Sequence, residues 1–132
     1  MNKGSIIQVS GPVIDVRFER RQLPAIREAL HTRLSGRKML MEVAQHVSAD
    51  TVRCIMLSDS EGLSRGMEVE ATGECISVPV GEATLGRMFN VLGEVIDGGE
   101  AVPEDCLRLP IHRKAPSFAE QQPAAQILET GI

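Results

Sequence analysis

The first 80 residues alternate between apolar and polar side chains in short runs, a pattern typical of β-strands that bury one face. In the clearest run, Ile14, Val16 and Phe18 should face inward, and Asp15 and Arg17 should lie on the solvent-facing side. Turn-forming residues separate the runs. The predicted strands are residues 5–9, 13–18, 39–47, 51–57, 67–71 and 76–80.

The most secure local prediction is a hairpin, in which residues 48–50 form the turn between the strands at 39–47 and 51–57. The residues of its first strand expected to face inward are Met39, Met41, Val43 and Val47. Residues 19–38 are the least regular part of this region. A short helix running from Leu23 to about Leu34 and an irregular excursion between strands are equally compatible with that sequence.

Six short strands at roughly even spacing indicate a mainly β fold, a small closed six-stranded antiparallel barrel. Closure removes the unpaired strand edges that would otherwise invite aggregation. The composition is 42% apolar but only 2% aromatic, with no Trp or Tyr. The core of the barrel should therefore be aliphatic.

One short helix is expected after the barrel. Leu85, Met88, Phe89 and Leu92 fall at the i, i+3, i+4 and i+7 positions of a helical stripe. Thr84 can cap the start of this helix. The pattern predicts a helix over residues 84–92.

Prolines punctuate the rest of the chain at residues 103, 110, 116 and 123, a density that excludes a long helix. This proline-rich tail should be extended, and it cannot build a core of its own. The sequence thus divides into a barrel domain at 1–80 and a second region at 81–132.

Two glycines, Gly81 and Gly86, have the spacing of a phosphate-binding loop. In such a loop Lys and then Ser or Thr follow the second glycine, whereas here Arg87 and Met88 occupy those positions. Methionine cannot supply the hydroxyl that coordinates magnesium. The broken motif and the helical stripe through it both argue against nucleotide binding at this loop.

The net charge of −4 is unevenly distributed, because the acidic excess lies wholly in residues 81–132. Basic residues cluster at 17–21 and 33–38. Such runs are more often solvated loop faces than nucleic-acid sites. A barrel that binds single-stranded nucleic acid remains the alternative, but it needs aromatic stacking platforms. The only aromatic residues are Phe18, Phe89 and Phe118, on three different predicted elements.

The three cysteines, Cys54, Cys75 and Cys106, are odd in number and far apart. They indicate reduced, packed thiols rather than disulfides or a metal site. The histidines are equally scattered, which favours structural roles. We expect no signal peptide, and the sequence has no apolar run long enough to cross a membrane.

Several sequence motifs occur in the same order as in a known protein family. They are Gly-Pro-Val-Ile-Asp-Val at 11–16, Glu-Val-Ala-Gln-His at 42–46, Ile-Ser-Val-Pro-Val-Gly-Glu-Ala-Thr-Leu-Gly-Arg at 76–87, Pro-Ile-His-Arg at 110–113 and Ile-Leu-Glu-Thr-Gly-Ile at 127–132. In this set the chain resembles the N-terminal part of the catalytic β subunits of F-type ATP synthases. Related ring ATPases share the motif that ends at Arg87. The motifs at 42–46, 110–113 and 127–132 resemble the β subunit in particular.

The resemblance implies a barrel followed by a RecA-like nucleotide-binding domain, of which residues 81–132 would be the start. The family's phosphate loop, catalytic glutamate and adenine-stacking residues would all lie beyond Ile132. We therefore expect a fragment that is not itself an enzyme and holds no cofactor. The parent subunit would use ATP or ADP with magnesium in synthesis coupled to proton transport. It would be cytoplasmic and peripheral to the energy-transducing membrane, without direct membrane contact.

The partners implied by the resemblance are the α subunits of an alternating ring, and no nucleic acid is expected. The charged residues expected at the subunit interface are Arg17, Arg20, Arg21, Arg37, Lys38, Asp59 and Glu61. The residues expected to pack at the seam between the two domains are Leu85, Met88, Phe89 and Leu92.

Overall fold

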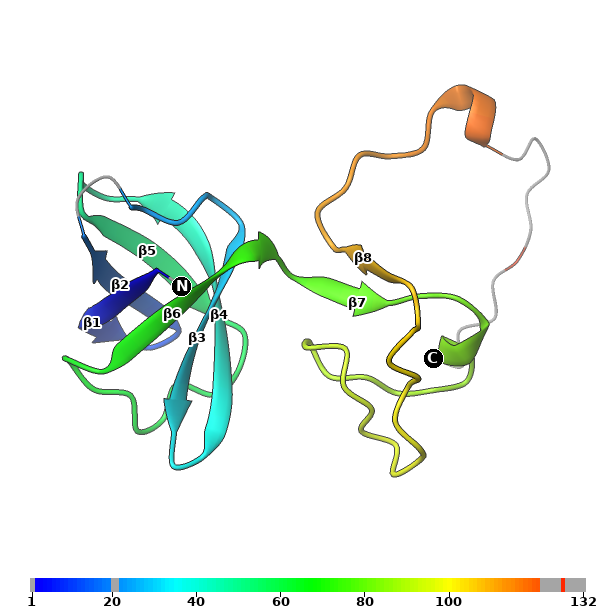
Figure 1. Ribbon diagram of the computed structural model, residues 1–132, viewed down its shortest axis with the longest axis horizontal. Coiled ribbons are helices and arrows are strands. Elements are labelled where there is room, and N and C mark those ends of the chain that lie inside the picture. The colour runs from blue at the N-terminus through cyan, green and yellow to red at the C-terminus, as the bar shows by residue number, and fades with distance from the viewer. Residues whose placement is uncertain (1, 20–21, 122–126, 128–132) are drawn as a thin grey trace. The chain divides into compact units, whose positions relative to one another are not determined.

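The computed structural model describes residues 2–19, 22–121 and 127. The chain forms two compact units, Met1–Ile76 and Ser77–Ile132 (Figure 1). The first unit is a closed antiparallel barrel, and the second contains short strands and single turns of 3₁₀-helix.

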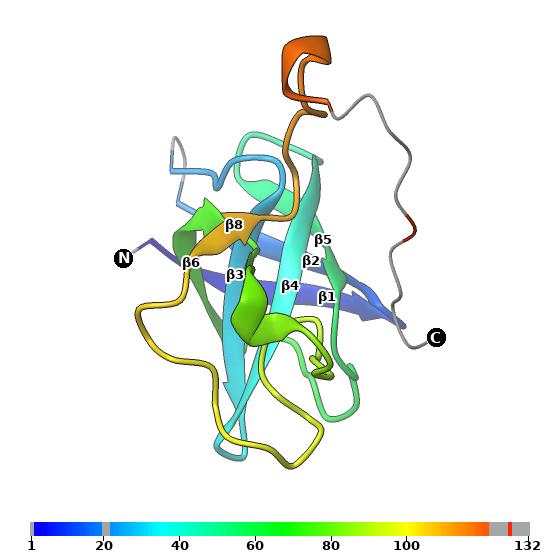
Figure 2. The ribbon, with the colours of Figure 1, turned by 90° about the vertical axis from the view of Figure 1, so that its right-hand side faces the viewer.

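The barrel closes through six strands in the order β1-β2-β5-β4-β3-β6, with β6 pairing back onto β1 (Figure 2). Every pairing is antiparallel, so the predicted fold class is confirmed. The strands are β1 (Lys3–Ser10), β2 (Val13–Phe18), β3 (Glu28–Leu34), β4 (Arg37–His46), β5 (Thr51–Met56) and β6 (Glu68–Cys75).

The barrel interior is aliphatic, as the composition predicts. Inward-facing residues alternate with outward-facing ones along each strand, so that every strand contributes to one shared core. Phe18 is the only aromatic residue among the buried core side chains of the described chain. The largest fully buried side chains are Ile6, Ile14, Leu30, Met41, Val16, Val43, Val52, Val69 and Cys54.

The hairpin of β4 and β5 is confirmed, with Met39, Met41 and Val43 buried. Val47, expected to face inward, is instead 47% exposed. The cause is a shift in the β4–β5 register between Val43 and Gln45. An extra residue in one strand reverses the faces that follow it, so alternation read from the sequence fails beyond a bulge.

The sequence pattern placed one of the six barrel strands on the wrong residues. The strand that it missed is β3 (Glu28–Leu34), in the region for which both a short helix and an irregular excursion were considered. The buried Glu28 carboxylate fixes the start of β3, because it accepts hydrogen bonds from the amides of Ala25 and Gly73. The strand predicted at 76–80 lies outside the barrel. It is the short β7 (Ser77–Pro79), and it pairs with β8 (Arg108–Pro110).

The helix predicted at 84–92 is wrong. Only a single 3₁₀ turn, η1 (Glu82–Thr84), forms before the backbone turns at Gly86, whose φ is +69°. Leu85 is 70% exposed and Met88 59% exposed, whereas Phe89 forms an isolated bridge with Val95. Glycine adopts this left-handed conformation readily, and here it breaks the predicted helix at its third residue.

The tail contains no helix longer than one turn within its described residues, in keeping with its prolines. The turn is η2 (Phe118–Glu120), and at its start the Glu120 carboxylate accepts hydrogen bonds from the Ser117 amide and hydroxyl, at 2.8 Å and 2.7 Å. The expectation of an extended chain over 122–126 and 128–132 falls outside the described residues.

Candidate functional site

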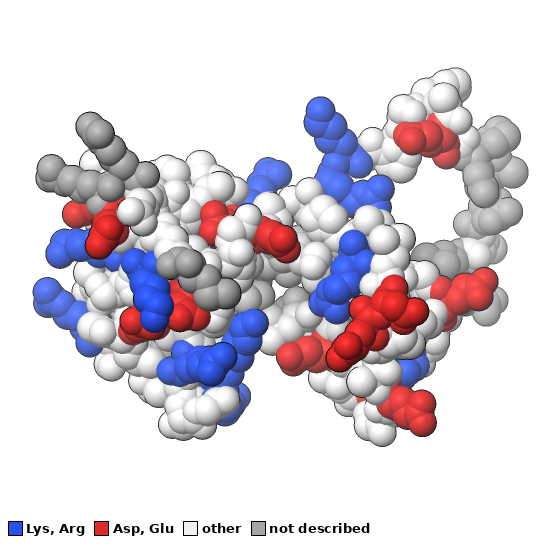
Figure 3. All heavy atoms as spheres, in the orientation of Figure 1, with Lys and Arg blue, Asp and Glu red and all other residues white. Residues whose placement is uncertain are grey.

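Hairpin β3–β4 carries Arg37 and Lys38, two of the five basic side chains predicted to contact a neighbour. Its two-residue turn is Ser35-Gly36, both with positive φ (50° and 82°). This turn geometry matches the twist of the flanking strands. It places Arg37 opposite Leu34, and Lys38 next to it on the same strand. Figure 3 shows several basic side chains on the part of the barrel where this hairpin runs toward its turn.

The structure brings together three of the predicted interface residues. Arg37, Asp59 and Glu61 line one cavity of about 160 Å³, whose other lining residues are Leu34 and Met39. Asp59 Oδ1 also accepts a hydrogen bond from the Glu61 amide at 3.0 Å, which shapes this loop. Apolar side chains and charges of both signs therefore line the same cavity.

Arg17 is not part of this cluster. It lies on the outer face of β2, where its Nε is 3.6 Å from the Asp50 carboxylate and its side chain is 57% exposed. An exposed pair of this kind contributes little to stability. The predicted contacts of Arg20 and Arg21 fall outside the described residues.

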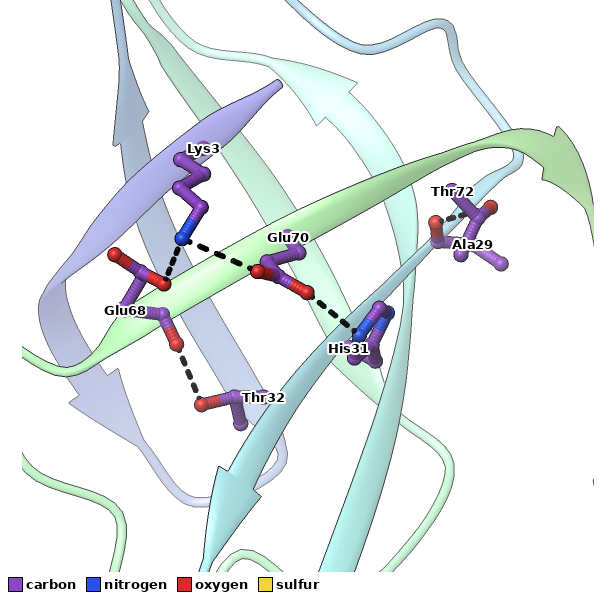
Figure 4. Close-up of polar contacts among 7 residues, drawn as sticks. All are labelled: Lys3, Ala29, His31, Thr32, Glu68, Glu70 and Thr72. Carbon is purple, nitrogen blue, oxygen red and sulfur yellow. Dashed lines mark hydrogen bonds and ion pairs between the residues drawn. The ribbon is translucent and has the colours of Figure 1, made fainter. Parts of the chain in front are cut away.

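A second charged cluster was missed by sequence reasoning. Glu70 on β6 lies between Lys3 of β1 and His31 of β3, with Oε1 3.3 Å from Lys3 Nζ and Oε2 3.0 Å from His31 Nε2 (Figure 4). Lys3 Nζ also lies 2.7 Å from the Glu68 carboxylate. Lys3 lowers the pKa of Glu70 through its hydrogen bond, with smaller contributions from His31. The hydrogen bonds from Glu68 and Glu70 raise the pKa of Lys3.

No local signal could have revealed this cluster. Lys3 and Glu70 are direct partners in the β1–β6 ladder, and His31 and Glu70 are partners in the β3–β6 ladder. Both contacts depend on the order of strands around the barrel. The residues are too far apart in the sequence for a spacing motif to link them.

On β2 and β5, Asp15 and Arg53 form a two-pronged ion pair. Arg53 Nε donates to Asp15 Oδ1 at 2.8 Å, and a second guanidinium nitrogen donates to Oδ2 at 2.9 Å. The guanidinium covers Asp15, which is only 7% exposed although it lies on the outer face of its strand. These hydrogen bonds lower the pKa of the Asp15 carboxyl.

The loop with phosphate-loop spacing is held together by an internal ion pair. Arg87 Nε donates to Asp97 Oδ2 at 2.7 Å, and its terminal nitrogen donates to the Glu100 carbonyl, also at 2.7 Å. Asp97 in turn accepts hydrogen bonds from the amides of Met88 and Gly99. Arg87 and these amides hold the pKa of Asp97 far below its usual range. The one cation of the motif is therefore engaged by a carboxylate.

All three cysteines are free, but Cys75 is exposed, so the expectation of packed thiols is wrong at that residue. Cys54 is buried in the barrel core, and this burial raises the pKa of its thiol to about 12. Within the described residues, no group of His, Cys, Asp or Glu side chains could hold a metal ion. Likewise, no helix in the described part of the chain is long and apolar enough to span a bilayer.

The aromatic residues do not form a stacking platform on the barrel. Phe18 is buried in the core, and Phe118, 92% exposed, belongs to the second unit. The described part of the chain therefore lacks the feature on which single-strand binding by such a barrel depends.

Taken together, the first unit is a small closed antiparallel barrel built around one shared core. Residues 6–73, more than half of the chain and nearly all of the barrel, match the β-barrel domain of the ATP synthase alpha/beta family. The chain belongs to this family.

Proposed function

We propose that this chain is the N-terminal part of an F-type ATP synthase β subunit, and that its barrel joins the α subunits on either side into an alternating ring. The observation that carries the proposal is the coincidence of the family match at 6–73 with the closed barrel. Assignment to β rather than α rests on the resemblance of the motifs at 42–46, 110–113 and 127–132.

A closed barrel suits a subunit that must stay rigid while other parts of a machine move. Each of the six strands pairs with two neighbours, so most strand edges of the barrel are paired. Its strands share one buried, mainly aliphatic core. Such a unit can hold the ring together throughout a nucleotide cycle.

In this proposal the chemistry belongs to the parent subunit's nucleotide-binding domain, to which residues 81–132 contribute the first segment. The parent binds ATP or ADP with magnesium and works with proton transport. It is cytoplasmic and peripheral to the membrane. The present chain contributes no catalytic residue and holds no cofactor.

The proposed contacts with α subunits are the charged residues named above, from Arg17 to Glu61. The cavity lined by Arg37, Asp59 and Glu61 supports this choice, because it offers both charges around an apolar floor. For the domain seam, the exposure of Leu85 and Met88 supports packing against a further element. Phe89 and Leu92 are half-buried within their own unit.

Ring assembly tests the proposal. The parent β subunit that contains this chain would be co-expressed with its α subunit, and the assembled rings would be quantified by native mass spectrometry. We expect Arg37→Glu to reduce the assembled fraction, because it places three carboxylates around one cavity. Arg113→Glu, which reverses an exposed charge in the second unit, is the matched control. A barrel that never joins an α subunit, whatever its charges, contradicts the proposal.

A further inference from the structure

The outer half of β3 has one open edge. Its pairing with β4 continues to Leu34↔Arg37, whereas its pairing with β6 ends at His31↔Glu70. Beyond that point the Thr32 hydroxyl donates to the Glu68 carbonyl at 2.7 Å, so a side chain replaces the ladder (Figure 4). The hairpin therefore extends past the closed part of the barrel as a two-stranded ribbon.

The hydrogen-bonding groups on this edge belong to Arg33. In a two-residue hairpin the pair beside the turn, here Leu34 and Arg37, exchanges hydrogen bonds across the ribbon. The main-chain groups of the alternate residues of β3 then point away from β4, toward β6. The Ala29 carbonyl is one of them, because it accepts a hydrogen bond from Thr72 of β6. The amide and carbonyl of Arg33 point to the same side, where the described residues provide no ladder partner.

A groove lies along this edge. It has a volume of about 500 Å³ and is lined by His31, Thr32, Arg33, Met67, Glu68 and Glu70. An extended chain hydrogen-bonded to a sheet edge lies about 4.8 Å from it, so this groove is where an added strand would enter. The Thr32–Glu68 hydrogen bond closes its inner end and limits the added pairing to the neighbourhood of Arg33.

The charges around the groove favour an acidic occupant. The carboxylates of Glu68 and Glu70 are already engaged by Lys3, and Glu70 also by His31. Arg33, in contrast, stands directly opposite Lys38 in the β3–β4 ladder. Both are exposed, and neither forms an ion pair with any described residue. Like charges in direct opposition destabilise a strand pair, so a carboxylate from outside would relieve this repulsion.

We propose that the outer edge of β3 binds an extended acidic segment of a neighbouring protein chain as an added strand. The segment's main chain pairs with the amide and carbonyl of Arg33. Its acidic side chains lie beside Arg33 and Lys38, and the alternate side chains are apolar and contact Met67. The proposal deepens the ring function and rests on it in one respect, that the segment belongs to a neighbouring subunit.

This occupant fits better than a nucleic acid. The lining contains no aromatic side chain on which a base could stack. An extended peptide, unlike a nucleic acid, can also pair its main chain with the amide and carbonyl of Arg33.

The test uses the full 132-residue chain and a short blocked peptide that alternates Glu and Val. Binding is followed by amide chemical shifts, and affinities are compared between Arg33→Pro and Lys38→Pro. Each variant removes one cation and one main-chain amide from the same ribbon. The Arg33 amide lies on the β3 edge and the Lys38 amide on the β4 edge. Proline is tolerated at edge positions whose amide lies outside the ladder. We expect Arg33→Pro to weaken binding at least about fivefold more than Lys38→Pro, through the lost main-chain hydrogen bond.

Three further measurements complete the experiment. Arg33→Ala, which keeps the amide, should bind more tightly than Arg33→Pro. In the unaltered chain, saturation with peptide should protect the Arg33 amide from hydrogen exchange, so the test holds even if a proline variant does not fold. Equal weakening by the two proline variants with no protection at Arg33 overturns strand addition. Tighter binding of a single-stranded oligonucleotide, or pairing of the chain with a second copy of itself at this edge, overturns the choice of occupant.

Failure of this inference can be distinguished from failure of the ring function. If the parent subunit carrying Arg33→Pro assembles into rings as well as the unaltered parent does, strand addition within the ring is excluded and the assembly role stands. If the unaltered parent forms no ring while the peptide still binds at Arg33, the assembly role fails and the edge requires a different partner.

Discussion

At the scale of single residues, burial and pairing decide which charges matter. Arg17 and Asp50 form an exposed pair at 3.6 Å. Asp15 and Arg53, by contrast, join through two short hydrogen bonds over a covered carboxylate. The sequence marked Asp15 only as an outward-facing residue on its strand. Its partner could not be identified, because the pairing depends on which strand lies next to β2.

Replacing Asp15 by Asn should lower the free energy of unfolding by about 1–2 kcal/mol at neutral pH, reduced from the buried-pair value because Arg53 is 44% exposed. The folded-state pKa of Asp15 is lowered, so this stabilisation is complete above the ordinary aspartate pKa of about 4 and is lost as the pH falls from there through the lower folded-state pKa. Urea titrations across this range should therefore show the two proteins converging in acid. Glu104→Gln, at an exposed position, is the control. A constant difference down to strongly acid pH would contradict the assignment.

At the scale of elements, side-chain hydrogen bonds override local periodicity. The stripe of Leu85, Met88, Phe89 and Leu92 predicted a helix, yet the backbone turns at Gly86. In this loop Asp97 binds Arg87 and the Met88 amide, and that amide would otherwise serve a helix. The Asp97 carboxylate, which accepts a hydrogen bond from an amide nine residues earlier, thus outweighs the helical pattern.

Asp97→Asn should loosen this loop without disturbing the barrel. The variant removes the charge that accepts from Arg87 and from the amides of Met88 and Gly99. We expect hydrogen exchange at the last two amides to accelerate roughly tenfold or more. Amides of β4 and β5 serve as the internal reference and should exchange at unchanged rates. Unchanged exchange at Met88 would show that the loop is held by something other than Asp97.

At the scale of the whole molecule, the aliphatic core places the stability in the barrel. Met41, Val43 and Val52 are fully buried. The second unit instead exposes several large apolar side chains, among them Leu107 at 64%. A two-stranded sheet such as β7–β8 is marginally stable by itself. The barrel should therefore be the unit that folds independently.

Two measurements test this distribution of stability. Residues 1–76 expressed alone should unfold cooperatively and keep the amide spectrum that they show in the full chain. Met41→Ala in the full chain should lower the free energy of unfolding of the barrel by about 2–5 kcal/mol, since it leaves a cavity in the core. Met88→Ala, at a position 59% exposed, is the matched control and should change it little. Failure of residues 1–76 to fold would place essential contacts in the second unit.

The sequence by itself determined the β-barrel and its family. Strands with one buried face carry their period in the sequence, as in Ile14, Val16 and Phe18, and the turn at 48–50 lies between two such strands. Strand β3 could not be predicted from periodicity, because its buried Thr32 is polar and its start depends on the buried Glu28 carboxylate.

Only the tertiary structure decided which charges meet and where the barrel leaves an edge open. Lys3, His31 and Glu70 come together because β6 lies between β1 and β3. The free edge at Arg33 exists because one ladder ends before the other. The physical reason is the same in both cases. Burial periodicity is a property of consecutive residues, whereas strand order and register arise from contacts between distant ones.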